Sequence, residues 1–365
     1  MSTMHARRRL QTGVATLGAI ALLASTGASP VAAKTDPVRK PAVANLANPG
    51  VVRESANGLW VIHGTGSWTS HPISVSKTTS PSSFHKISKQ PLLTGAVPDW
   101  MGAMSKGKRD KSIWAPSVIQ GGNGLYVAYF AVTVRHHGAA RCIGMGTSAY
   151  SVGPFTPQDK ALACFKGSGV NAHDNPKSEG KGFSFIDPTP VILGSEMVLT
   201  YKTQIKNGSK WHTTTRLLKL DLTDPTKVVG NPAHNSGASI KIANSSSKYI
   251  EENPNLALHG GTYTLFTSFG FYGTCDYVTR YHRVNGSSLW KGKTWLDANP
   301  HNLPFPKNTN TCGRGNAQVS NVGGDLWRIY FNGHASRSKT PGGPKNLYVG
   351  NVTWKKGKPY VSKIR

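Results

Sequence analysis

Acidic residues are scarce in this sequence. Its 365 residues include 16 Asp and Glu against 43 Lys and Arg, which gives a net charge of +27. The basic residues are spread along the whole chain rather than gathered in one stripe, so the charge does not predict a nucleic-acid reader. We instead predict a solvated basic surface that attracts polyanions such as cell walls or pectin, and no nucleic-acid partner.

Long apolar runs are also missing after the first few dozen residues. Residues 7–9 are three arginines, Val14 to Ala24 form a short apolar stretch, and small residues lead to Ala33. This order is typical of a secretory signal peptide, 1–33, cleaved after Ala33. A membrane anchor is the alternative, but the apolar stretch is short for a bilayer. Loss of the three arginines would lower the net charge from +27 to +24.

The remainder divides into a linker and one large domain. Residues 34–45, "KTDPVRKPAVAN", contain the Pro and Lys that are common in linkers. Residues 46–365 are many for a simple domain but ordinary for a closed β architecture. We predict a secreted, extracellular monomer without a membrane partner.

Cysteines are few and even in number: Cys142, Cys164, Cys275 and Cys312. An even count in an exported chain favours disulfides. Three pairings are open, and sequential pairing closes the shorter loops. A metal site is the weaker alternative, because the sequence contains no CxxC or HxxxH spacing.

Helical periodicity is nearly absent, and one phrase recurs instead. A proline follows a small or polar residue, and then come a short apolar stretch, a glycine turn and an aromatic-rich strand. The copies, the last without the proline, are 48–66, 115–133, 187–204, 253–270 and 315–334. The turn glycines Gly58, Gly124, Gly194, Gly261 and Gly324 are separated by 66, 70, 67 and 63 residues. A near-constant period indicates a repeat architecture.

The content of each repeat predicts strands and hairpins. Radial repetition of such sheets makes a β-propeller, so we predict an all-β, five-bladed β-propeller with a single domain. A β-sandwich is the alternative. In a propeller, the first strand of each blade lines the channel, and equivalent positions at its start converge. Those positions are Asn48, Ala115 or Ser117, Asp187, Glu252 or Asn253, and Asn316.

Two of the carboxylates, Asp187 and Glu252, begin predicted inner strands. An acid beside another carboxylate in a partly dry site has a raised pKa and can protonate a leaving oxygen. Glycoside hydrolysis uses such a pair. The structural alternative is that Asp187 caps backbone amides and Glu252 pairs with a surface lysine. Glu251 is expected to point the other way, because side chains alternate along a strand.

The motifs around these residues are similar to those of a known family. They are "PDW" (98–100), "WAPSV" (114–118), "SVGPF" (151–155), "FIDPTPVI" (185–192) and "EENPNL" (251–256). In order and spacing, the chain from about 46 to 358 resembles glycoside hydrolase family 43 and its arabinanase-like relatives. The resemblance implies an exported five-bladed propeller enzyme that cuts arabinose- or xylose-containing plant polysaccharide.

The resemblance also implies an inverting mechanism with three carboxylates. Asp187 matches the Asp of the "IDP" motif, which tunes the pKa of the acid, and Glu252 matches the general acid. The family's general base is an Asp at the start of the first blade, where this chain has Asn48. A neutral amide cannot take a proton from water.

This departure leaves three explanations. Another carboxylate stands in for the base, with Asp99, Asp110 and Asp174 as loop candidates. Alternatively, catalysis is weak or needs an outside nucleophile. The third explanation is that the protein binds sugar without cutting it.

Sugar-binding residues are predicted from the same resemblance and from aromatic positions expected around the channel mouth. They are Asn48, Trp114, Ser117, Tyr272 and Asn316. Aromatic faces pack against sugar C–H bonds, although blade core is the alternative for Trp114 and Tyr272. Blade core is the prediction for Trp60, Tyr126, Tyr263 and Trp327, which recur at one repeat position.

Asn316 also bears on the metal question. In arabinanase relatives, this place often holds a channel histidine that binds a metal or water. Asn316 offers one carbonyl oxygen, whereas calcium prefers more oxygens and charge. We therefore predict no cofactor, with calcium as the alternative.

The resulting hypothesis is a secreted glycosidase, arabinanase- or arabinofuranosidase-like, acting on arabinan, xylan or related polysaccharide in anionic pectin. Glu252 and Asp187 are its predicted catalytic residues. A catalytically silent carbohydrate-binding propeller is the alternative that Asn48 favours, and a cationic wall-binding protein is a third. The sequence does not distinguish endo from exo action.

Overall fold

The computed structural model describes residues 40–54, 58–76, 84–86, 90–229, 238–307, 311–334 and 345–364. The chain divides into two units, residues 1–35 and 36–365, and every described residue belongs to the second. The predicted signal peptide (1–33) and the beginning of the predicted linker (34–39) lie outside the described residues. The described part of the chain contains no helix that is long and apolar enough to cross a membrane.

Strands, nearly all of them antiparallel, make up most of the described residues, as the alternating and β-branched runs predict. Within the described residues, five sheets contain at least four strands. The first consists of β1 (Gly50–Arg53), β2 (Trp60–His63), β4 (Ile73–Ser76) and β5 (His85–Lys86). The second contains β8 (Ser112–Gln120), β9 (Tyr126–Thr133), β10 (Arg141–Ser148), β12 (Ala161–Ala163), β13 (Ala172–Asp174) and the short strands β3 (Gly66–Ser67) and β11 (Thr156–Pro157).

The other three large sheets follow the order of the chain. The third is β14 (Ser184–Leu193), β15 (Glu196–Asn207), β16 (Lys210–Leu220) and β17 (Ser239–Ser247). The fourth is β18 (Ile250–His259), β19 (Thr262–Gly270), β20 (Val278–Asn285) and β21 (His301–Asn302). The fifth is β22 (Cys312–Gly323), β23 (Leu326–His334), β24 (Asn346–Lys355) and β25 (Lys358–Ile364). A hairpin of β6 (Met104–Ser105) and β7 (Lys108–Arg109), the turn η1 (Gly286–Ser288) and the helix α1 (Gly292–Leu296) complete the described elements.

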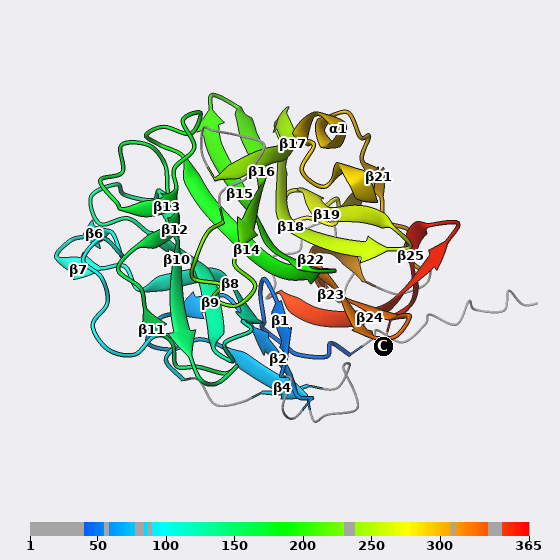
Figure 1. The fold of residues 1–365 in the computed structure, drawn as a ribbon, viewed down its shortest axis with the longest axis horizontal. Coiled ribbons are helices and arrows are strands. Elements are labelled where there is room, and N and C mark those ends of the chain that lie inside the picture. Colours follow the sequence, from blue (N-terminus) through cyan, green and yellow to red (C-terminus); the bar gives the residue numbers. More distant parts are fainter. Residues whose placement is uncertain are drawn as a thin grey trace, which may run out of the picture. The chain divides into compact units, whose positions relative to one another are not determined.

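The first strands of the repeats contact one another in a closed circuit. β1 contacts β8, β8 contacts β14, β14 contacts β18, β18 contacts β22, and β22 contacts β1. Figure 1 shows these inner strands around the middle of the described region, with the other strands of each sheet outside them. The arrangement is therefore all-β and propeller-like, as the period of the repeats predicts.

The hydrophobic core lies between successive sheets. Each of five clusters of buried residues combines two neighbouring sheets, including the last with the first. Examples are Val61 with Phe130, Tyr129 with Leu199, Val198 with Leu265, Phe266 with Ile329, and Tyr330 with Ile62. The four aromatic residues predicted as blade core, Trp60, Tyr126, Tyr263 and Trp327, are all buried. Face-to-face burial of this kind holds each sheet against its neighbours.

The ends of the domain and its disulfides add further links. Val43, in the predicted linker, forms a β-bridge with Leu347 and is buried. The disulfides are Cys142–Cys164 in the second sheet and Cys275–Cys312, which joins the segment before β20 to the start of β22. Of the three pairings that the sequence leaves open, the structure has the sequential one.

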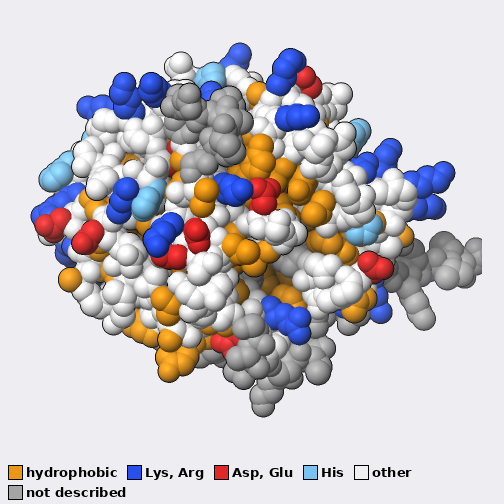
Figure 2. Space-filling model, viewed as in Figure 1, with side chains coloured by type: hydrophobic (Ala, Val, Ile, Leu, Met, Phe, Trp, Pro, Cys, Tyr) orange, Lys and Arg blue, Asp and Glu red, His pale blue; other side chains and the backbone are white. Residues whose placement is uncertain are grey.

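The charge distribution agrees with the sequence pattern. Figure 2 shows Lys and Arg side chains scattered over the visible face, with few Asp and Glu among them. Hydrophobic side chains gather near the middle of the same face, around a hollow.

Candidate functional site

Five residues with left-handed backbone angles stand where the inner strands begin. They are Asn48 (φ 52°), Ala115 (φ 44°), Asp187 (φ 58°), Asn253 (φ 53°) and Asn316 (φ 48°), which we call the axial ring. Positive φ is uncommon outside glycine, and strained positions of this kind cluster at functional sites. A proline follows four of the five, and because proline has no N–H to give to a ladder, regular pairing is hard to maintain there. The registers of β8, β14, β18 and β22 shift at these points.

Polar bonds connect the axial ring. Asn253 Nδ2 donates to Asn316 Oδ1 at 2.7 Å, and Asn316 Nδ2 donates to Asn48 Oδ1. The backbone N–H of Asn253 donates to Asp187 Oδ2 at 3.1 Å, which links the third and fourth sheets. The structure thus brings together residues that lie more than 250 positions apart in the chain, Asn48 and Asn316.

Asn48 is held on both sides of its amide. Its Oδ1 accepts from Asn316, and its Nδ2 donates to Thr65 Oγ1 at 2.9 Å. Its backbone N–H donates to Asn332 Oδ1 at 2.8 Å, and Thr65 Oγ1 also accepts the N–H of Ala115 at 3.1 Å. Asn48, the residue that the resemblance places at the base position, is therefore a fixed and neutral member of the axial ring.

Asp187 and Glu252 meet at one lysine. Lys202, in β15, has a fully buried side chain, and its Nζ lies 3.4 Å from Asp187 Oδ2 and 2.7 Å from Glu252 Oε2. The sum of these two distances, 6.1 Å, is the greatest separation that the two carboxylate oxygens can have. The side chains of Asp187 and Glu252 remain 7% and 12% exposed. We call these three residues the acid cluster.

The surroundings of the two acids in the cluster shift their pKa values in opposite directions. Burial raises the pKa of Asp187, an effect that the charge of Lys202 only partly offsets and the charge of Glu252 increases. Burial acts in the same direction on the pKa of Glu252, but the charge and hydrogen bond of Lys202 and the hydroxyl of Tyr277 hold that pKa below its ordinary value. The two acids, which titrate as a coupled pair, are therefore shifted in opposite directions.

Tyr277 contacts Glu252 from a second direction. Its hydroxyl donates to Glu252 Oε1 at 2.7 Å and also contacts Asn316 Oδ1. The ring of Tyr277 lies against Gly315, where an added Cβ would overlap it. Gly315 precedes Asn316 in the chain as Glu252 precedes Asn253. Because Gly315 has no side chain, the ring of Tyr277 has room to reach Glu252.

Glu251, as expected, faces away from this cluster. It accepts a hydrogen bond from Thr267 Oγ1 at 2.8 Å and lies 3.2 Å from His282 Nε2. Neighbouring glutamates therefore occupy separate polar environments, and only Glu252 bonds to Lys202.

Aromatic side chains are exposed near the same ends of the strands. Trp114, one residue before the axial ring, is 41% exposed, and the Arg141 guanidinium lies 3.6 Å from its ring centroid. Tyr272 is 47% exposed beneath Lys345 Nζ, which lies 4.5 Å from the ring centroid, and its ring contacts that of Phe271. Exposed aromatic faces of this kind suit sugar rings.

The carboxylates predicted as substitutes for the base have other partners. Asp99 is exposed and pairs with Arg135 at 3.0 Å. Asp110 accepts hydrogen bonds from hydroxyl groups of its own sheet, and buried Asp174 accepts one from Tyr201. Among the described residues, no hydrogen bond or ion pair joins these three acids to the acid cluster.

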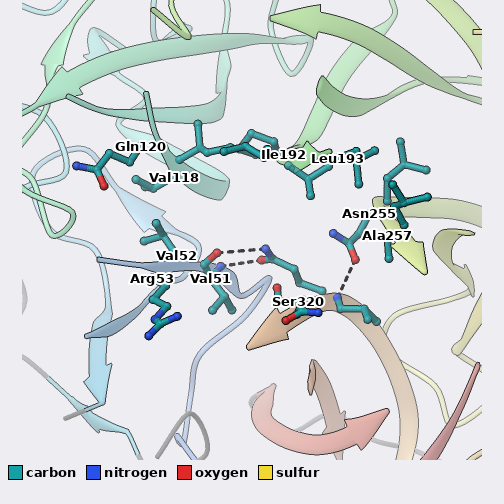
Figure 3. A pocket seen from close by; sticks show the side chains of 18 of the residues that line it. Val51, Val52, Arg53, Val118, Gln120, Ile192, Leu193, Asn255, Ala257 and Ser320 are labelled. Atoms are coloured by element: carbon teal, nitrogen blue, oxygen red, sulfur yellow. Dashed lines mark hydrogen bonds between the residues drawn. The ribbon is translucent and has the colours of Figure 1, made fainter. Parts of the chain in front are cut away.

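Two hollows lie along the inner strands, one at the axial ring itself and one farther along. A cavity of about 20 Å³ is lined by residues of all five inner strands, including Ser117. Ser117 is buried, and its Oγ has no hydrogen-bond partner in the described structure. A hollow of about 690 Å³ lies farther along, between residues such as Val51, Val118 and Ile192 (Figure 3). Ser117 is therefore directed toward the interior rather than beside the exposed aromatic residues.

Side-chain amides tie the inner strands together around the larger hollow. Gln318 accepts the N–H of Val51 at 2.7 Å and donates to its carbonyl at 3.2 Å, and Asn255 accepts the N–H of Val319 at 2.7 Å (Figure 3). These bonds replace the backbone ladder that is missing between separate sheets.

The residues around Asn316 do not fit a calcium ion. Both polar atoms of its side chain are bonded to protein groups, Asn48, Asn253 and Tyr277. No group of three His, Cys, Asp or Glu side chains suited to a metal occurs within the described ranges. Calcium prefers several oxygen ligands with negative charge, which this place does not offer.

Three residues of the site were not predicted from sequence: Lys202, Tyr277 and Lys345. Lys202 gives the clearest signal, because it interrupts the buried strand segment "VLTYKT" (198–203) with a charge that must find a partner. Tyr277 lies two residues after a cysteine, and its position depends on the space at Gly315.

Part of the chain is similar in sequence to known proteins. No protein-family model matches the chain. Its sequence is 27% identical over 232 residues to an Aspergillus flavus protein named "Probable arabinan endo-1,5-alpha-L-arabinosidase C", and a protein of the same name from Aspergillus oryzae matches equally. The match covers 61% of this chain and 62% of the relative's own length.

Solved structures extend the comparison to most of the chain. A thermostable family-43 glycoside hydrolase has a TM-score of 0.64 at 15% identity and covers 90% of this chain and 96% of that one. An α-L-arabinanase of Cellvibrio cellulosa, solved with arabinohexaose, has a TM-score of 0.56 at 17% identity and covers 88% and 96%. The protein is thus an all-β, propeller-like protein with buried acids at one end of its inner strands. Its fold is that of family 43 glycoside hydrolases, which confirms the predicted resemblance.

Proposed function

We propose that this protein is a secreted, inverting glycosidase that hydrolyses arabinose- or xylose-containing plant polysaccharide, with five sheets acting as the five blades of a propeller. The observation that carries the proposal is the acid cluster, in which Lys202 holds Asp187 and Glu252 within 6.1 Å of each other. The names of the similar proteins, arabinan-acting and family 43, support the substrate class.

Glu252 is the proposed general acid. It is more exposed than Asp187 and bonds to Lys202 and Tyr277 through separate oxygens. In the reaction, its proton passes to the glycosidic oxygen, and the bond from that oxygen to the anomeric carbon breaks. Water attacks the carbon from the opposite face and releases its proton to solvent, since Asn48 cannot accept it. Asp187 pairs with Lys202 and accepts the N–H of Asn253, and in this proposal it orients Glu252.

Glu252 must carry a proton before this step, although Lys202 and Tyr277 hold its pKa below the ordinary value. A bound sugar that excludes water from Glu252 raises the pKa of that acid by desolvation and favours its protonation. Asp187 is not the second carboxylate of an inverting pair, because such pairs stand about 6.5–9.5 Å apart to admit water.

The second candidate is a propeller that binds carbohydrate without cutting it. Asn48 supports this candidate, since its amide is neutral and both of its polar atoms are already bonded. Exposed Trp114 and Tyr272 would serve either function.

Export and a polysaccharide partner complete the proposal. Two disulfides are expected of a chain that passes through an oxidising compartment. The net charge of +27 favours substrates embedded in anionic pectin, and we propose that the protein acts as a monomer without nucleic acid or membrane.

Product analysis separates the two candidates. Purified protein is incubated with arabinan, arabinoxylan, xylan and pectic arabinan, and released sugars are measured by reducing ends and by size. Release of oligosaccharides or monosaccharides supports the glycosidase and also distinguishes endo from exo cleavage. Retention on the insoluble polysaccharide with no release supports the binding propeller.

A further inference from the structure

Lys345 is a half-buried cation without a hydrogen-bond or ion-pair partner among the described residues. It immediately precedes β24, and its Nζ stands over the exposed face of Tyr272. Its charge acts on the carboxylates of Glu252 and Asp187, although it bonds to neither. Lys202 differs from it, because Lys202 is fully buried and bonded to both acids.

The charges of these four groups do not balance in the state that catalysis requires. With both acids ionised, Asp187 and Glu252 neutralise Lys202 and Lys345. A general acid must carry a proton, and the four groups then have a net charge of +1. The axial ring supplies no compensating charge at Asn48 or Asn316, since both are amides.

We infer that Lys345 and Tyr272 form a subsite for an acidic sugar residue, a hexuronate, beside the bond that is cut. This inference rests on the proposed glycosidase function and specifies its substrate. The uronate carboxylate bonds to Lys345, and the sugar's C–H face packs on the exposed rings of Tyr272 and Phe271. The anionic group thereby supplies the negative charge that the protonated acid cluster lacks.

The chemistry of the subsite favours a sugar carboxylate over a free phosphate. One unpaired lysine matches one negative charge, whereas phosphate carries nearly two and is usually held by several donors. The aromatic surface of Tyr272 and Phe271 adds a contact that only a sugar can use. A chain with 43 basic and 16 acidic residues also attracts polyuronate from a distance.

Binding of small probes tests the subsite independently of cleavage. D-galacturonic acid, its neutral counterpart D-galactose, and inorganic phosphate are titrated separately into the full chain at low salt, with binding followed by NMR. We expect galacturonate to bind at least tenfold more tightly than galactose, which is the typical effect of a charge-assisted hydrogen bond. Lys345→Met should remove this preference, and Lys345→Arg should retain most of it.

The control is Lys358→Met. Lys358 is exposed in β25, and it pairs with Lys355 at the far end of β24 from Lys345, so the variant removes the same charge elsewhere in the fifth sheet. Tyr272→Leu provides a second variant, expected to weaken both sugars. Thermal unfolding of each variant verifies the fold.

Three outcomes overturn the inference. The first is equal affinity for galacturonate and galactose, and the second is a preference that survives Lys345→Met. The third is Lys345-dependent binding of phosphate without binding of galacturonate, which would assign the subsite to a free anion. Because binding is measured, failure of the glycosidase proposal appears separately, as absence of sugar release from every polysaccharide.

Discussion

The hydroxyl of Tyr277 donates a hydrogen bond to Glu252 Oε1 at 2.7 Å. Tyr277 lies in the segment just before β20, and Glu252 lies in β18. The bond therefore joins two parts of the fourth sheet and its connection that are 25 residues apart in the sequence. Together with Lys202 on the other oxygen, it stabilises the ionised form of Glu252. The proton affinity of the proposed acid is therefore set by two named groups that can be altered one at a time.

Tyr277→Phe should shift the pH dependence of activity. The substitution removes a hydrogen bond that lowers the pKa of Glu252, so that pKa rises. Glu252 acts in its protonated form, so activity is present below this pKa and is lost as pH rises through it. The alkaline limb of the kcat/KM profile should move to higher pH, while Lys202 and Lys345 remain in place. Tyr281→Phe, in β20 of the same sheet, is the control and should leave the profile unchanged.

Glu252→Gln should abolish hydrolysis while preserving the fold. Loss of a general acid costs about 10²- to 10⁴-fold in rate, and Gln can keep a bond to Tyr277. Glu251→Gln is a matched control, because Glu251 bonds to Thr267 and His282 instead of the acid cluster. Product release is measured for both variants, with thermal unfolding alongside. Normal turnover of Glu252→Gln would remove Glu252 from the mechanism.

Asn48→Asp should raise the rate of hydrolysis tenfold or more. A carboxylate there can accept from both Thr65 and Asn316 and has further lone pairs for water, so it supplies the missing base. Asn316→Asp places the same charge elsewhere in the axial ring and should give no increase. The measurement is initial rate on the best polysaccharide. Equal effects of the two substitutions would show that charge alone matters, not the position of a base.

Removal of the Cys275–Cys312 disulfide should weaken substrate binding. The bridge anchors the segment that carries Tyr272 and Tyr277 to the start of β22. Its 37-residue separation and the 22-residue separation of Cys142–Cys164 predict similar losses of stability, about 3–4 kcal/mol each. Replacing both cysteines of each pair by serine therefore gives a matched comparison. KM should rise only for the Cys275–Cys312 variant, and equal KM values would separate this disulfide from the site.

Several features of the fold and site could be predicted because they follow from periodic sequence. The spacing of Gly124, Gly194 and the other turn glycines predicts hairpins, and each lies between the first two strands of a sheet with positive φ. The "IDP" and "ENP" phrases predict that Asp187 and Glu252 stand near the starts of inner strands and meet at one end of the channel. The structure has both within the first four residues of β14 and β18, in contact with Lys202. The even number of cysteines predicts disulfides, and the structure has the pairing that closes the shorter loops.

Other features could not be predicted because they depend on tertiary packing. The choice between Ala115 and Ser117, or between Glu252 and Asn253, depends on which residue takes positive φ at a bulge, and a bulge breaks the alternation that sequence patterns rely on. Lys202 carries a charge that ordinarily indicates a surface position, yet two carboxylates from β14 and β18 make its burial stable. Lys345, just before β24, contacts Tyr272, which lies between β19 and β20 of the fourth sheet. A contact between segments so far apart in the sequence leaves no local pattern from which to predict it.

The axial ring nearly closes the space along the central axis of the inner strands. Only about 20 Å³ of open space separates the acid cluster from the hollow at the other end of the inner strands. That volume holds a single water molecule. For the proposed glycosidase, this closure means that a polysaccharide cannot pass along the central axis. Its products would leave from the same end of the inner strands at which the substrate binds, so we expect product inhibition of that activity.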